Sequence, residues 1–168
     1  MQVRRILSAV LILPALVAAA PPTRVVAASG AWAALSRGGI CEAASAALRP
    51  PQKDRPQARA SLSFDGRRQG QFAARLSRPP RSGAAIMLHV GDSPFLLVSR
   101  GDRAWSNGTA QDLAIIAAIR GASGMRVEAR SPGGGRIIDR YELAGAPTAI
   151  DAAAACSAAL LQKARFQP

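Results

Sequence analysis

A regular alternation of apolar and polar residues is the feature that most constrains how this chain can fold. Every second residue is apolar in ARASLSFD (58–65), and the pattern resumes in QFAARLSR (71–78) after the turn-like GRRQG. Successive side chains of a strand point to opposite faces, so each segment predicts a strand with one buried and one solvated face. Together they predict a hairpin of antiparallel strands.

Other short segments are typical of strands and are separated by glycine- and proline-rich turns. They cover residues 31–36, 40–46, 86–90, 95–99, 125–130 and 136–143. Short strands at such spacing predict an antiparallel sheet, either a sandwich or a single curled sheet. The proline-rich segment 48–57 cannot be a central strand and is expected to be a loop.

Two segments have the composition and spacing of helices rather than strands. In 109–121, Leu113, Ile116 and Ile119 recur at helical spacing after a start at Thr109 and Asp112 that resembles a helix cap. The alanine-rich segment 148–166 repeats this start at Thr148 and Asp151, and it ends in Lys163 and Arg165. The expected fold class is therefore α+β, mainly antiparallel β, with two helices of which one is C-terminal.

The first twenty residues have the layout of a secretory signal peptide. Two arginines precede an apolar run of fifteen residues that ends in small residues. The run is too short to span a bilayer, which takes roughly 20 apolar residues. We expect residues 1–20 to be removed, with a second possible cleavage as late as position 28. A flexible leader (21–30), a single β-rich domain (31–166) and no transmembrane segment would remain.

The chain contains two cysteines, Cys41 and Cys156. Cysteines of an exported protein usually pair, because that compartment is oxidising. A zinc site needs more ligands than two distant cysteines and one histidine supply, and a redox pair would lie close in sequence. We therefore predict a structural disulfide, with Trp32 as a core aromatic nearby and no cofactor.

Several of these features coincide in a pattern that resembles the invasion-associated locus B family, in particular a diverged alphaproteobacterial branch of exported proteins. The pattern comprises the signal peptide, GAW at 30–32, Cys41 at the start of a short apolar strand, and YELAGAPTAIDAAAAC at 141–156. The resemblance implies a non-enzymatic β-rich protein of the periplasm or outer surface that acts by binding an envelope partner. In some pathogens the family is linked to host-cell entry.

Basic residues exceed acidic ones by 22 to 10, which gives a formal charge of +12, or +10 once Arg4 and Arg5 leave with the signal peptide. One predicted hairpin and its exit loop are rich in arginine. These residues are Arg59, Arg67, Arg68, Arg75, Arg78 and Arg81. They suit a polyanion such as lipopolysaccharide or an anionic lipid, although an ordinary solvated face in an arginine-rich protein has the same composition.

The residues bear on two other functions, hydrolysis and nucleic-acid binding. His89, the single histidine, could serve a small periplasmic hydrolase with Asp92 or Asp139, but no nucleophile motif accompanies it. Asp139 lies on an apolar strand face, where we expect an arginine partner or an edge position. Export and the scarcity of aromatic side chains argue against a nucleic-acid partner.

Overall fold

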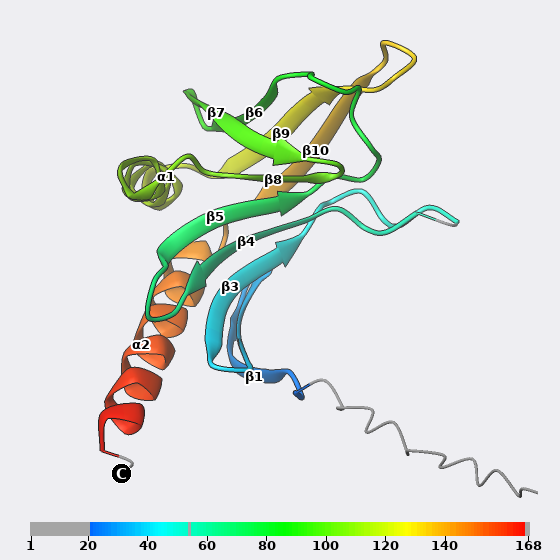
Figure 1. The fold of residues 1–168 in the computed structure, drawn as a ribbon. Coiled ribbons are helices and arrows are strands. Elements are labelled where there is room, and N and C mark those ends of the chain that lie inside the picture. Colours follow the sequence, from blue (N-terminus) through cyan, green and yellow to red (C-terminus); the bar gives the residue numbers. More distant parts are fainter. Residues whose placement is uncertain (1–20, 54, 167–168) are drawn as a thin grey trace, which may run out of the picture.

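The computed structural model describes residues 21–53 and 55–166, which form one open antiparallel sheet with two helices (Figure 1). Its strands are β1 (Arg24–Ser29), β2 (Trp32–Arg37), β3 (Ile40–Ala46), β4 (Arg59–Phe64), β5 (Gln69–Arg75), β6 (Ile86–Val90), β7 (Ser93–Arg100), β8 (Arg103–Trp105), β9 (Gly124–Arg130) and β10 (Arg136–Glu142). The helices are α1 (Thr109–Gly121) and α2 (Ala146–Arg165). The predicted α+β class, mainly antiparallel with a C-terminal helix, is confirmed. The signal peptide predicted at 1–20 lies outside the described residues.

The strands follow the order β1-β2-β3-β4-β5-β8-β7-β6-β9-β10 across the sheet. Both helices cover the same face, α2 over β1 to β5 and α1 over β5 to β7. Leu62, Phe72 and Val127 point to this face and are fully buried. Buried alanines of α2, among them Ala149 and Ala153, let the helix approach the strands closely. In the described part of the chain, no helix covers the opposite face.

The predicted disulfide is present and joins β3 to α2. Cys41 and Cys156 are bonded across 115 positions of sequence. Trp32 is a core aromatic, as predicted, with 1% of its surface exposed. Its indole Nε1 donates a hydrogen bond of 2.8 Å to the carbonyl of Glu142, at the end of β10. The β2–β3 hairpin is therefore joined to both α2 and β10.

Two glycines make the closest approach between these ends of the chain. Gly30, in the β1–β2 turn, and Gly145, before α2, both have positive φ angles, of 55° and 85°. A Cβ on Gly145 would lie 1.9 Å from the carbonyl oxygen of Ser29, and one on Gly30 would lie 2.3 Å from that of Ala144. The backbone N–H of Ala31 donates to the same Ala144 carbonyl at 3.2 Å. These contacts explain the glycines of GAW and LAGAP.

Two strands differ from the sequence prediction. Residues 24–29, expected within a flexible leader, form β1 and pair with β2 in an antiparallel ladder. This strand lies at the edge of the sheet, so it lacks a periodic buried face, which is the signal that marks other strands. Three-residue β8, too short to show alternation, was not predicted, and it separates β5 from β7.

The caps of both helices and the start of α2 differ from the prediction, whereas α1 begins at Thr109 as predicted. Neither helix has a side-chain cap, since Gly108 and Gly145 occupy the N-cap positions. Because Pro147 fits the first turn, α2 begins at Ala146, and Thr148 and Asp151 lie inside it. Asp112 is buried at the start of α1, where its carboxylate accepts hydrogen bonds from the Ser106 hydroxyl and the Phe72 backbone N–H. Asp112 therefore links α1 to β5 and to the residue after β8, and does not cap the helix as expected.

The pairing of β1 distinguishes between the two predicted cleavage sites. Cleavage as late as position 28 would remove nearly all of β1 and leave β2, which also pairs with β3, as the edge strand. Of the two predicted cleavage sites, we therefore expect the earlier one, before Arg24, to be used. Intact-mass analysis of the protein isolated from the cell envelope measures this directly, and a mature chain starting at position 28 or 29 would contradict it.

The contact at Gly145 predicts a large loss of stability on substitution. Gly134 is the matched control, because it also has a positive φ, of 80°, but has no atom within 4 Å of a built Cβ. Gly134→Ala should cost about 1 kcal/mol for its backbone conformation alone. Gly145→Ala should cost about 4 kcal/mol or more, because the Ser29 carbonyl blocks the new methyl group. Denaturant unfolding compares the two, and equal losses would refute the steric argument.

Candidate functional site

Four arginines lie side by side across β4, β5, β8 and β7, and we call them the arginine row. Arg59 pairs with Arg75 across β4 and β5, and Arg75 pairs with Arg103 across β5 and β8. Arg103 in turn pairs with Arg100 across β8 and β7. Neighbouring strands are about 4.8 Å apart, so the row spans about 14 Å at the backbone.

The alternation of the strands fixes the direction of the row. Ala60, Ala74 and Ala104, each adjacent in sequence to a row member, are buried on the helix-covered face. The row therefore belongs to the opposite, uncovered face. Arg75 is half-buried, and the other three arginines are exposed.

A hollow of about 480 Å³ lies on this face over β4, β5 and β8. Three arginines of the row line it, together with Ser61, Gln71, Trp105 and the carboxylate residue Glu42. Its size falls in the usual range for small-molecule sites. The hollow offers cations, neutral hydrogen-bonding groups and one aromatic ring.

The row is short of negative partners. Glu42 forms an ion pair with Arg59 at 2.5 Å. Arg75 donates from Nη2 to the carbonyl of Gln57 at 3.0 Å, and no ion pair of the described residues involves Arg75, Arg100 or Arg103. Like charges directly opposite each other destabilise a sheet. Local conflicts with folding of this kind concentrate at functional sites.

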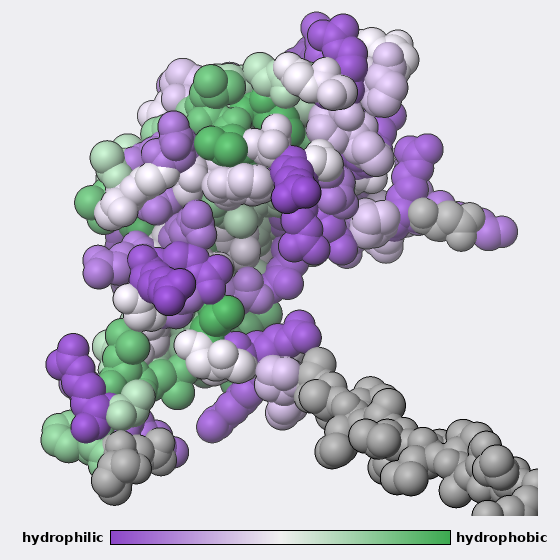
Figure 2. Space-filling model, viewed as in Figure 1, coloured by the Kyte–Doolittle hydropathy of each residue, from purple (hydrophilic) through white to green (hydrophobic). Residues whose placement is uncertain are grey.

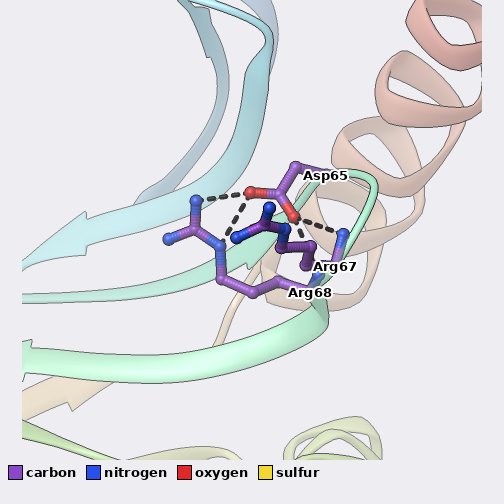
Figure 3. Close-up of polar contacts among 3 residues, drawn as sticks. All are labelled: Asp65, Arg67 and Arg68. Atoms are coloured by element: carbon purple, nitrogen blue, oxygen red, sulfur yellow. Dashed lines mark hydrogen bonds and ion pairs between the residues drawn. The ribbon is translucent and has the colours of Figure 1, made fainter.

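The six arginines predicted from sequence do not form one cluster. Arg59 and Arg75 belong to the row, whereas Arg67 and Arg68 lie in the β4–β5 turn at the far end of the hairpin. There the Asp65 carboxylate accepts the backbone N–H groups of Arg67 and Arg68, each at 2.8 Å, and the Arg68 side chain (Figure 3). Arg68 therefore has a structural partner of its own.

Arg78 and Arg81 lie in the connection from β5 to β6, next to the β9–β10 hairpin. The Arg78 guanidinium donates to the carbonyl of Arg136, and the backbone N–H of Arg81 donates to that of Arg130 at 2.7 Å. Sequence reasoning missed Arg100 and Arg103, because it did not predict the strand that brings them beside Arg75.

His89 and Asp139 lie on opposite faces of the sheet, which argues against a catalytic pair. His89 is half-buried on the uncovered face and pairs in register with Arg126. Asp139 is buried on the covered face, where it accepts the backbone N–H of Ser77 at 2.9 Å. It lies on the edge strand β10, one of the two positions predicted for it. Burial, with a smaller effect of Asp139, raises the pKa of neighbouring Tyr141.

The described residues contain no cluster of three or more histidine, cysteine or carboxylate side chains that could hold a metal ion. None of their helices has the length and hydropathy to cross a membrane.

Comparison with known proteins bears on the fold. No family model and no curated protein matches the chain. Among solved structures it is similar to invasion associated protein B from Bartonella henselae, with a TM-score of 0.56 and 16% sequence identity. This chain has that fold. The similarity covers 83% of this chain and 99% of the other, so the resemblance expected from the sequence is confirmed for the fold.

The Asp65 turn predicts a specific dependence of stability on pH. The hydrogen bond from Arg68, supported by the two backbone N–H groups and opposed by burial, lowers the pKa of Asp65 to about 2. A lowered pKa stabilises the fold above the unfolded value of about 4 and ceases to do so as the pH falls through 2. Asp65→Asn should cost about 1 kcal/mol at neutral pH, allowing for solvent screening.

This cost should disappear between about pH 4 and pH 2, as the wild-type carboxylate becomes protonated. Denaturant unfolding at several pH values measures it. Asp92→Asn, in an exposed turn, is the control. A cost for Asp65→Asn that is unchanged at pH 2 would show that the charge contributes nothing.

Proposed function

We propose that this chain is an exported envelope protein that acts by binding, and that the arginine row binds an anionic component of the envelope. The observation that carries the proposal is the register of Arg59, Arg75, Arg103 and Arg100 on the uncovered face. A ligand with phosphate or carboxylate groups would remove the repulsion within the row. Guanidinium groups bind both anions in a bidentate manner.

The structure and composition agree with an envelope location. The Cys41–Cys156 disulfide fits an oxidising compartment, and the excess of basic residues favours a negatively charged surface. The protein of similar fold is described as invasion associated. For this chain we propose surface binding alone, in agreement with the non-catalytic role that the sequence predicts.

A comparison of two double variants tests the role of the row. Arg100→Gln with Arg103→Gln removes two row members, and Arg37→Gln with Arg165→Gln removes the same charge from exposed positions elsewhere. We expect the row variant to lose most of its affinity for soluble polyphosphate, and the control to lose little. Titration at increasing salt should show wild-type binding weakening steeply, because exposed charges are screened.

The row variant, which should lose affinity for polyphosphate, should be more stable than the wild type. Loss of Arg103 relieves repulsion with both of its neighbours, so the row variant should gain about 0.5 kcal/mol at low salt. Thermal unfolding measures this gain, which a residue retained only for packing would not give. Equal polyphosphate binding by the two double variants would refute the proposed role of the row.

A further inference from the structure

An apolar strip runs next to the arginine row on the same face. Trp105 pairs with Ala73 on β5 and with Val98 on β7. Each of these residues lies two positions along its strand from a member of the arginine row, so it points to the same face. Leu96 continues the strip along β7. Leu96 and Val98 are 57% and 40% exposed. Figure 2 shows apolar surface around the position of β7.

The direction of these side chains follows from the strand pattern. Leu97 is buried on the helix-covered face, so Leu96 and Val98 point the other way, as Arg100 does. On β8, buried Ala104 separates Arg103 from Trp105 in the same manner. One face therefore presents a row of cations beside a strip of apolar side chains, of which Leu96 and Val98 are exposed and Trp105 is half-buried.

A purely ionic ligand would satisfy the arginines and leave the apolar strip in water. Contiguous exposed apolar side chains rimmed by charge mark an interaction site. An anionic lipid suits both parts, because its phosphate is charged and its acyl chains are apolar. Tryptophan is enriched where a protein meets the membrane–water interface.

A second copy of the chain is a poorer occupant. In a two-fold dimer the same patch faces itself. Such an arrangement would bring the arginine row of one copy toward that of the other, and within the described part of the chain Glu42 is the one carboxylate paired with the row. Charge complementarity therefore favours an anionic occupant.

We propose that this face binds an anionic phospholipid in a membrane surface, with the phosphate headgroup at the arginine row and the adjoining acyl chain against Trp105, Val98 and Leu96. This proposal rests on the proposed function and specifies its ligand. The hollow of about 480 Å³ holds the headgroup, and Trp105, which lines it, marks the boundary between the polar and apolar contacts.

Vesicle binding tests this proposal. We expect the protein to bind vesicles of phosphatidylcholine mixed with phosphatidylglycerol, and not vesicles of phosphatidylcholine alone. Each arginine removed from the row should weaken vesicle binding about fivefold, the usual contribution of a basic residue near an anionic membrane. Brominated acyl chains should quench the fluorescence of Trp105, while Trp32 is buried in the core and distant from solvent.

A second pair of variants separates lipid binding from simple anion binding. Leu96→Ser with Val98→Ser removes the apolar strip, and Leu113→Ser with Leu161→Ser removes similarly exposed side chains from the helices. The strip variant should bind anionic vesicles about tenfold more weakly, and it should keep its affinity for soluble polyphosphate. The helix variant should match the wild type in both assays.

The outcomes distinguish the two proposals. Binding to polyphosphate without binding to anionic vesicles, or vesicle binding unaffected by loss of the strip, would overturn the lipid proposal and leave the anion-binding function standing. Failure to bind either ligand would overturn both.

Discussion

The docking of α2 on the first strands, closed by the Cys41–Cys156 bond, is the constraint on which the rest of the structure depends. β1 to β3 form one end of the sheet, and the apolar face of β2 and β3 is buried because the last element of the chain returns to cover it. Gly30 and Gly145 allow the backbones of the two ends to touch. In the chain-entropy account, a cross-link over 115 residues stabilises a fold by about 4–5 kcal/mol. That is comparable with the whole net stability of a small domain.

Because both helices pack on one face of the sheet, the charged side chains of the opposite face depend on other strand side chains for ion-pair partners. The β9–β10 hairpin supplies such partners in part, although Arg136 opposes Arg130 and Arg140 opposes Arg126 across it. Glu128 accepts from Arg126 at 2.5 Å and from Arg136 at 3.2 Å, and these partners lower the pKa of its carboxyl. The arginine row is less well matched, since Glu42 is the one carboxylate paired with it among the described residues. Two of the four arginines of this hairpin thus have a carboxylate partner, whereas one of the four row members does.

The sequence predicted the fold class, the disulfide, α1 with its observed bounds and the strands that have a buried face, because burial on one side leaves a periodic pattern. It did not predict β1, which lies at an edge, or β8, which is three residues long. Without β8 the arginine row could not be predicted, because the neighbours of Arg75 depend on strand order and register. Proximity in sequence suggested Arg67 and Arg68 instead, and the turn around Asp65 holds them at the other end of the hairpin.

Composition alone does not account for the row. Lys53 and Lys163 are the only lysines, so a bias toward arginine explains why the cations of this face are arginines. It does not explain why four of them occupy one register position on four adjacent strands, where each pair opposes folding. Nor does it place half-buried Trp105 and exposed Val98 side by side on the same face, two positions along their strands from the row. An anionic amphiphile is the class of ligand that makes both arrangements favourable at once.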